Sequence, residues 1–284
     1  MTVERETRAV ALVTGASSGF GLHTSVALAQ AGFRVVAAMR SPEKRHDLLQ
    51  TAETAGVRER IDVRRMDVTD HAGIVQTVEE IAAAYGRIDV LVNNAGFAAG
   101  GVVEEVDEDT WRAQMETNFF GTVAVTRAVL PHMRRQRRGK IINMSSVSGR
   151  TAFPGYAPYA ASKFAVEGFT EALRLEVLPF GIHAVLIEPG AYKTEIWRKG
   201  FATIRMRENS PYQPMLEAVL RMSRRTAETA PPPQEVAAAV VKAALAPAPR
   251  LRYPLGRGTA AMSLLRSLLP WKWYERIVLW ALHR

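Results

Sequence analysis

The chain has 284 residues, 48% of them hydrophobic, which is enough for one large α/β domain or two small domains. It contains no cysteine, which excludes disulfides, thiolate catalysis and cysteine-based zinc sites. The six histidines are scattered without a ligand motif, so we predict no metal site. The N-terminal residues are polar and too few for a signal peptide, and no uncharged apolar run reaches the roughly 18–20 residues of a membrane span. We therefore expect a cytoplasmic protein.

The formal net charge of +9 is concentrated near the C-terminus. Residues 247–284 hold seven arginines and lysines against one acid, Glu275, so the main body is close to neutral. A near-neutral body argues against a nucleic-acid-binding domain. A second basic cluster, residues 134–140, is interpreted as the solvated end of a helix, where cations are favourable.

The first predicted strand, residues 9–14, is a short apolar run that leads into a glycine-rich turn. Residues 22–32 then follow a helical pattern that ends at a glycine. A strand, a glycine turn and a helix N-terminus together form a site for a dinucleotide pyrophosphate, because the backbone can approach the anion and free N–H groups face it. The predicted cofactor-binding residues of this turn are Gly15, Ser17, Ser18, Gly19, Phe20 and Gly21.

The second predicted strand, residues 33–39, is followed by Arg40. An NAD site usually places an acid about 20 residues after the glycines, where it binds the ribose 2′-hydroxyl. Here Met39 and Arg40 stand instead, and a guanidinium suits a 2′-phosphate. We predict that NADP(H) is preferred, with NAD(H) as the alternative.

The third and fourth predicted strands, residues 61–68 and 88–92, end in further candidate cofactor contacts. Ligands bind at the carboxyl ends of parallel strands, so Asp67 is placed to meet an adenine amino group. After the fourth strand, small residues let a flat ring lie close, and asparagines can stabilise the turn. The candidates at these two ends are Asp67, Val68, Asn94, Ala95 and Gly96.

A helix is predicted from residue 109 to about residue 135, with Pro131 expected to kink or break it near its end. Asn118 lies in its middle, where asparagine is a poor choice for stability, so a specific role is indicated.

The fifth predicted strand, residues 140–146, ends in a serine pair, and a loop then leads to a helix containing Tyr159 and Lys163. Residues four apart lie on the same face of a helix. An ammonium beside a phenol favours the phenolate, so we expect the pKa of Tyr159 to fall below its usual value of about 10. Ser146 is placed to hold a substrate carbonyl while Tyr159 acts as general acid or base.

Together these motifs resemble the short-chain dehydrogenase/reductase family over about residues 8–245. The sixth strand, residues 182–187, is followed by the last matching motif, a proline and a glycine with a threonine four residues later. The matching positions are residues 14–21, Asp67, Val68, residues 93–96, Asn118, Ser146, Tyr159, Lys163, Pro189, Gly190 and Thr194.

The resemblance implies an α/β fold with a doubly wound, Rossmann-like parallel sheet and helices on both faces. It implies that Tyr159 is the general acid or base, that Lys163 lowers its pKa and binds the nicotinamide ribose, and that Ser146 polarises the substrate carbonyl. Asn118 would hold a water behind Lys163. It adds Tyr159, Lys163, Pro189, Gly190 and Thr194 to the cofactor-binding residues, and suggests a homodimer or homotetramer through the helices of Asn118 and Tyr159.

The predicted function is transfer of a hydride between NADP(H) and the carbonyl or alcohol group of a hydrophobic small molecule, as in the steroid- and retinoid-type members of the family. A 3-oxoacyl-thioester reductase has the same four catalytic residues and stays open as an alternative. A non-catalytic NADP(H)-binding regulatory protein is the second alternative.

We expect a single domain with its core at residues 8–194 and 231–246, a helical substrate lid at residues 195–230 and a C-terminal extension at residues 247–284. A helix is predicted over residues 234–245. The apolar lid residues either line a substrate site or form the core face of two helices, and both interpretations stay open. They are Trp197, Phe201, Ile204, Met206, Met215, Leu216, Leu220 and Met222.

The extension is basic and rich in aromatic residues, with Trp271, Trp273 and Trp280 in its last 14 positions. Three interpretations remain open: a helix that packs on the same chain or on a partner subunit, peripheral contact with a membrane, and a wall of the substrate pocket.

Overall fold

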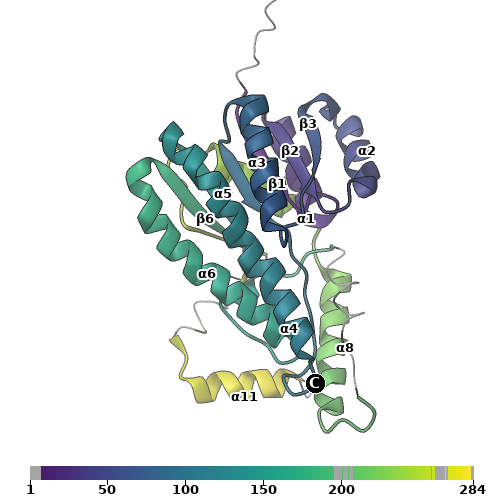
Figure 1. The fold of residues 1–284 in the computed structure, drawn as a ribbon. Coiled ribbons are helices and arrows are strands. Elements are labelled where there is room, and N and C mark those ends of the chain that lie inside the picture. Colours follow the sequence, from purple (N-terminus) through teal and green to yellow (C-terminus); the bar gives the residue numbers. More distant parts are fainter. Residues whose placement is uncertain are drawn as a thin grey trace, which may run out of the picture.

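The computed structural model describes residues 8–194, 200, 204, 207–256, 258–259, 266 and 268–282. Its centre is a parallel sheet of seven strands in the order β3-β2-β1-β4-β5-β6-β7 (Figure 1). The chain order reverses beside β1, which creates a crevice between β1 and β4 at the carboxyl ends of the strands. The strands are β1 (Val10–Thr14), β2 (Arg34–Met39), β3 (Ile61–Arg65), β4 (Val90–Asn93), β5 (Gly139–Met144), β6 (Ile182–Pro189) and β7 (Arg252–Leu255).

Helices cover both faces of the sheet, as the predicted doubly wound fold requires (Figure 1). One face is packed by α1 (Gly19–Gln30), α2 (His46–Thr54) and α9 (Gln234–Leu245). The opposite face is packed by α3 (His71–Tyr85), α5 (Gly121–Gln136) and α6 (Ala157–Val177). Short 3-10 turns occupy Pro42–Arg45, Arg58–Arg60, Val147–Gly149 and Leu178–Phe180.

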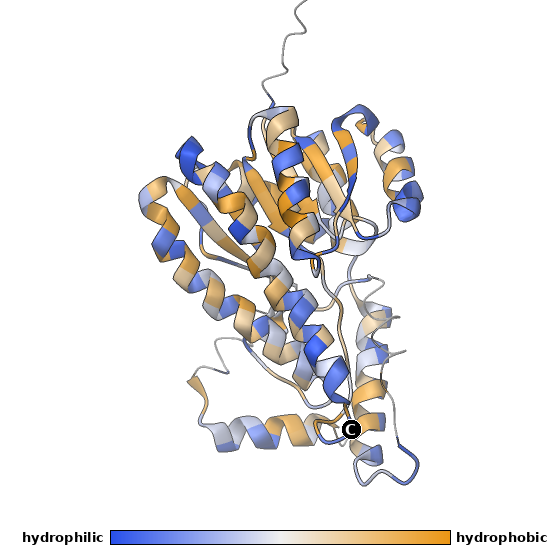
Figure 2. Ribbon diagram, in the orientation of Figure 1, coloured by the Kyte–Doolittle hydropathy of each residue, from blue (hydrophilic) through white to orange (hydrophobic). Residues whose placement is uncertain are grey.

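The strands are apolar on both sides because both faces of the sheet are buried. In β1, Ala11 and Val13 contact the α1 side, whereas Val10 and Leu12 contact the α3 side. Figure 2 shows the result, with hydrophobic strands enclosed by helices that carry hydrophilic residues on their outer sides. The continuous apolar runs of the sequence are therefore the centre of the fold.

Three further helices, α4 (Glu108–Met115), α8 (Gln213–Thr229) and α11 (Trp271–Leu282), lie beyond the sheet at the end where α6 begins (Figure 1). α11 packs on α8, where Val278 and Leu282 belong to one apolar cluster with Ala218 and Val219. No helix among the described residues is long and apolar enough to cross a membrane.

Two features differ from the sequence expectations. The helix predicted from residue 109 to 135 is divided into α4 and α5 by a π-helical turn, Glu116–Phe120, and α5 then runs through Pro131 without a break. The break expected near Pro131 therefore does not occur: Val129 and Met133, on either side of it, are fully buried and hold the helix against the sheet. The seventh strand, β7, was not predicted.

Candidate active site

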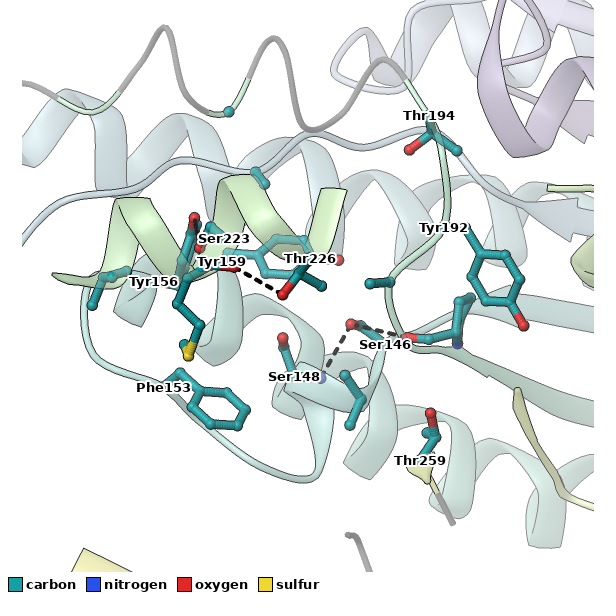
Figure 3. A pocket seen from close by; sticks show the side chains of 18 of the residues that line it. Ser146, Ser148, Phe153, Tyr156, Tyr159, Tyr192, Thr194, Ser223, Thr226 and Thr259 are labelled. Carbon is teal, nitrogen blue, oxygen red and sulfur yellow. Dashed lines mark hydrogen bonds between the residues drawn. The ribbon is translucent and has the colours of Figure 1, made fainter. Parts of the chain in front are cut away.

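A cavity of about 390 Å³ lies beyond the carboxyl ends of β5 and β6 (Figure 3). Ser146 and Tyr159 border it on the sheet side, and α8 and the end of α11 form the opposite walls. Most of its lining is apolar or aromatic. The lining residues include Phe20, Phe153, Pro154, Tyr156, Pro189, Gly190, Tyr192, Thr194, Val219, Met222, Ser223, Thr226 and Leu282.

Ser146 is held by backbone groups just after β5 (Figure 3). Its Oγ accepts a hydrogen bond from the Ser148 N–H at 3.1 Å and donates one to the Pro189 carbonyl at 3.4 Å. Tyr159 lies in the first turn of α6 and borders the same cavity. The structure therefore brings together the hydroxyl and the phenol that the sequence predicted to act on one substrate oxygen.

Lys163 lies one helical turn after Tyr159, and its ammonium group is 5.7 Å from the centre of the Tyr159 ring. The Lys163 Nζ donates a hydrogen bond to the Met144 carbonyl at the end of β5, at 2.7 Å. Burial lowers the pKa of Lys163 to about 8, although Glu167, one turn further along α6, acts in the opposite direction. Lys163 is thus fixed between α6 and the sheet.

The expected fall in the pKa of Tyr159 is contradicted by the structure. Burial raises the pKa of Tyr159 above its ordinary value, and the hydrogen bond with Ser146 lowers it by less. The physical reason is that a buried phenol loses the solvation that would stabilise its charged phenolate form. At neutral pH Tyr159 is therefore protonated, the form that a general acid requires.

Asn118 lies in the π-helical turn and is 1% exposed. Its Oδ1 accepts from the Phe97 N–H at 3.0 Å, and its Nδ2 donates to the Phe97 carbonyl at 2.9 Å and to Ser162 Oγ at 3.1 Å. Ser162 Oγ in turn donates to the Tyr159 carbonyl at 2.7 Å. A π turn widens the helix locally, and here it joins the strand-end segment after β4 to the helix that carries Tyr159.

The glycine turn between β1 and α1 leaves no room for a side chain at Gly15 or at Gly21. Gly15 has φ +66°, and a Cβ added at Gly21 would lie 2.3 Å from the Gly15 carbonyl oxygen. Asn94 stabilises the turn from β4, because its Nδ2 donates to the carbonyls of Thr14 at 2.9 Å and Gly15 at 3.1 Å. Ala95 lies against Gly15, and Gly96 against Asn118. Asn94 thus shapes the turn through its side chain.

Two observations show that this turn fits a dinucleotide. Ser18 precedes the first residue of α1, and no hydrogen bond from its side chain caps the helix, so the first N–H groups face outward to an anion. Thr194 lies 3.6 Å from the Cβ position of Gly19, and its buried Oγ1 has no hydrogen-bond partner among the described residues. Ser17 lies in the same turn. The Phe20 ring packs edge-on against the Tyr192 ring, with 5.8 Å between the two ring centres.

The remaining predicted cofactor residues lie at neighbouring strand ends, outside the cavity. Arg40 follows β2 and is exposed, without an ion pair to any residue that the structure describes. Asp67 follows β3, where its Oδ1 accepts from the N–H and hydroxyl of Thr69 at 3.0 and 2.8 Å. Val68 packs beneath Gly121. Arg40 and Asp67 thus both lie just beyond the carboxyl ends of neighbouring strands, β2 and β3.

Comparison with known proteins agrees with this geometry. Residues 9–204 match the family model described as short chain dehydrogenase. The chain belongs to the short-chain dehydrogenase family. Members of this family are oxidoreductases that act on carbonyl or alcohol groups with a nicotinamide cofactor.

Three relatives show how far the likeness extends. An uncharacterized oxidoreductase of Bacillus subtilis, YusZ, is 44% identical over 95% of this chain and 96% of its own. A 3-ketodihydrosphingosine reductase of Bacteroides thetaiotaomicron is 45% identical over 65% of this chain and 64% of its own. The human 17-beta-hydroxysteroid dehydrogenase type 1 is 34% identical over 87% of this chain and 77% of its own.

Among solved structures, an actinorhodin polyketide ketoreductase with NADPH has a TM-score of 0.76 at 34% identity, covering 89% of this chain and 97% of that chain. The doubly wound fold is therefore that of the short-chain dehydrogenases, and it reaches beyond the residues of the family model.

A buried charge network behind the active site of this short-chain dehydrogenase was not predicted from the sequence. Glu188, the last residue but one of β6, lies beside Glu167 of α6, and Arg252 of β7 contacts both, with Nε 2.9 Å from Glu188 and Nη2 3.1 Å from Glu167. Burial raises the pKa of Glu188 to about 7; Glu167 adds to this rise, whereas Arg150 and Arg252 oppose it. These residues are far apart in the chain, and no local motif marks them.

The structure distinguishes between interpretations of the C-terminal extension and of the lid that the sequence left open. α11 packs on its own chain and also forms part of the cavity wall through Leu282, so two of the three interpretations hold together. In the lid, Met222 lines the cavity while Leu216 is buried in the helix packing, so both interpretations apply. Ile204 packs against Gly100. Trp197, Phe201 and Met206 lie outside the described residues.

Proposed function

We propose that this short-chain dehydrogenase reduces the carbonyl group of a hydrophobic small molecule, steroid-, retinoid- or lipid-like, with NADPH, and catalyses the reverse oxidation with NADP. The observation that carries the proposal is the largely apolar cavity into which the Ser146 hydroxyl and the protonated Tyr159 phenol both open. A pocket of this kind binds apolar bodies and orients them through a few polar groups.

We assign the following roles in cofactor binding and catalysis to the residues of the chain. Gly15, Gly19 and the first turn of α1 would hold the pyrophosphate, and Lys163 and Thr194 would contact the nicotinamide end. A bound nicotinamide supplies the hydride that the substrate carbon accepts, or takes it in the reverse reaction. Ser146 Oγ would hold the substrate oxygen, and the Tyr159 hydroxyl would give that oxygen its proton.

In this proposal Asn118 orients Tyr159, and Lys163 stabilises its deprotonated form. Asn118 orients the start of α6 through Ser162, which bonds the Tyr159 carbonyl. The cation of Lys163 over the Tyr159 ring stabilises the phenolate left after proton transfer, and a pKa of about 8 lets Lys163 pass a proton on near neutral pH. We retain the proposal that a water bound near Asn118 continues this proton path.

The preference for NADP(H) is supported by Arg40. It is the first residue after β2, it is exposed, and no acid stands at the position that would bind a ribose 2′-hydroxyl. Related structures contain NADPH in one case and NAD in another, so the preference is proposed from Arg40 alone.

The proposed assembly is a homodimer or homotetramer through the outer faces of α5 and α6. Apolar side chains are exposed along this surface, among them Phe164 and Leu175 of α6 and Phe120 just before α5. Burial of such residues favours association.

The activity is tested by NADPH consumption with a panel that contains a steroid ketone, a retinoid aldehyde, a long-chain 3-ketone and a 3-oxoacyl thioester. We expect turnover of hydrophobic ketones, and a loss of kcat of about a hundredfold or more in Tyr159→Phe with NADPH affinity retained. Turnover of the thioester alone would favour an acyl-thioester reductase. NADPH binding without turnover of any member would favour the regulatory alternative.

The cofactor preference is tested by titrating NADPH and NADH into wild type and Arg40→Ala. We expect wild type to prefer NADPH by about tenfold or more, equal to about 1.4 kcal/mol, and the variant to lose this preference. Arg134→Ala, which removes an exposed charge at the far end of α5, should keep it. Equal binding of both cofactors by wild type would contradict the role of Arg40.

A further inference from the structure

The outer side of α11 combines aromatic, aliphatic and basic side chains on the molecular surface. Trp273 is 58% exposed and Ile277 47% exposed, and Lys272 and Arg276 stand beside them on the same side of the helix. Trp271, Leu279 and Trp280 are also more than half exposed. In Figure 2 the first half of this helix is mostly hydrophilic and its second half mostly hydrophobic.

The contacts on the inner side of α11 explain where the helix lies. They do not explain the exposed aromatic and basic residues on its outer side. Val278 and Leu282 pack toward α8, and the Tyr274 hydroxyl donates to the Ala152 carbonyl at 3.1 Å. Residues four apart share one side of a helix, so these three contacts define the inner face. Trp273, Arg276 and Ile277 are therefore turned outward, away from the surface on which the helix rests.

We propose that the outer face of α11 docks on the surface of an anionic lipid bilayer. Tryptophan is suited to this environment because its ring is apolar and its N–H stays in the polar interface. An amphipathic helix with Trp and Ile among Lys and Arg lies in the plane of the interface and is attracted by anionic headgroups. The cations are already placed among the aromatic rings, with Arg276 5.8 Å from the Trp273 ring and Arg266 4.4 Å from the Trp271 ring.

The charge on the outer face of α11 favours anionic lipid over a second copy of the chain as the partner of this face. In a twofold contact the same surface meets itself, which would bring Lys272 and Arg276 of both copies together. Like charges at an interface oppose association, whereas anionic lipid neutralises them. The outer face of α11 therefore fits lipid better than itself.

The docked orientation places the cavity next to the bilayer. Leu282, the last residue of α11, lines the cavity, and Tyr274 bonds Ala152, which directly precedes the cavity residue Phe153. A hydrophobic substrate dissolved in lipid would thus have a short path to Ser146 and Tyr159. This step alone rests on the proposed function; the binding of α11 to lipid does not.

The proposal is tested by co-sedimenting the full chain with phosphatidylcholine vesicles that contain or lack phosphatidylglycerol. We expect binding to anionic vesicles, little to neutral ones, and at least about tenfold weaker partition for the double variant Trp273→Ala/Ile277→Ala. Leu245→Ala removes an exposed apolar side chain from the end of α9 and should bind as wild type. Because the readout is binding, a failed activity assay leaves this result unaffected.

The charge contribution is tested with Lys272→Gln/Arg276→Gln against Arg134→Gln/Arg137→Gln, which removes two exposed cations at the other end of the molecule. Only the first pair should weaken anionic binding, by about tenfold, with a matching loss of salt sensitivity. Absence of wild-type binding to anionic vesicles, or equal binding by all variants, would overturn the proposal. So would a change of oligomeric state in Trp273→Ala/Ile277→Ala without vesicle binding, which would assign the face to a second copy.

Discussion

At the scale of single residues, Tyr159 and Lys163 lie on one face of α6, and burial raises the pKa of the first and lowers the pKa of the second. Four residues on a helix determine the shared face. The pKa of each group depends on burial and on partners from other strands, such as the Met144 carbonyl that receives the Lys163 hydrogen bond. Short motifs carry the first kind of information and none of the second.

Glu188 illustrates a residue whose chemistry only the fold reveals. It is 2% exposed and shares its site with Glu167, and its pKa is raised to about 7. Between about pH 4.5 and 7 the folded state binds more protons at Glu188 than the unfolded state does. The stability that Glu188 contributes is thus fully present below about pH 4.5 and is lost as the pH rises through 7.

We predict that Glu188→Gln flattens this pH dependence. Its free energy of unfolding relative to wild type should rise between pH 5 and pH 8, because glutamine cannot become a buried charge beside Glu167. Urea unfolding at several pH values measures the effect. Glu171→Gln, which changes the exposed carboxylate that pairs with Arg252, serves as the control, and an identical pH response in both variants would contradict the assignment.

At the scale of elements, the apolar runs predicted six strands to within a few residues, because a strand buried on both faces has to be continuously apolar. The bounds of α1 and α9 were also predicted to within a few residues, whereas α2 was not predicted. The irregular turn at Glu116–Phe120 was not predictable, since it depends on what Asn118 meets after folding. β7 was missed for a similar reason. It is a short edge strand that includes Pro254, and its place is decided by β6 and by the contact of Arg252 with Glu188.

The π turn yields a prediction that separates positioning from stability. Asn118→Ala leaves the Phe97 N–H and Ser162 Oγ without their partner, and we expect a loss of about 1–3 kcal/mol in unfolding free energy. It should also lower kcat more than it changes KM, because Ser162 holds the start of α6 through the Tyr159 carbonyl.

Gln114→Ala is the matched control for this prediction. Gln114 is also buried and bonds the same segment, through the Ala99 N–H at 2.7 Å and the Phe97 carbonyl at 2.9 Å, but it has no bond to Ser162 among the described residues. We expect a similar loss of stability with kcat largely kept. Equal losses of kcat in the two variants would show that Asn118 acts only through general stability.

At the scale of the whole molecule, the predicted catalytic groups follow β5 or lie on the π turn and α6, whereas the opposite walls of the cavity come from α8 and from the last helix. The predicted catalytic residues and the opposite cavity walls therefore belong to different parts of the chain. The sequence predicted the first part by motif and left the second open. Whether Leu282 meets the cavity or solvent depends on how α11 crosses α8, and no residue pattern within α11 specifies that crossing.

The inner and outer faces of α11 should consequently be separable by experiment. Leu282→Ala removes three carbons from the cavity wall, and we expect it to shift the ratio of kcat/KM between a bulky and a small ketone by about tenfold in favour of the bulky one. Ile277→Ala, on the outer side of the same helix, should leave that ratio unchanged. Steady-state kinetics in solution, without lipid, measures both. If both variants shift the ratio equally, α11 acts on the cavity as a whole through its packing on α8; if neither does, the substrate does not reach Leu282.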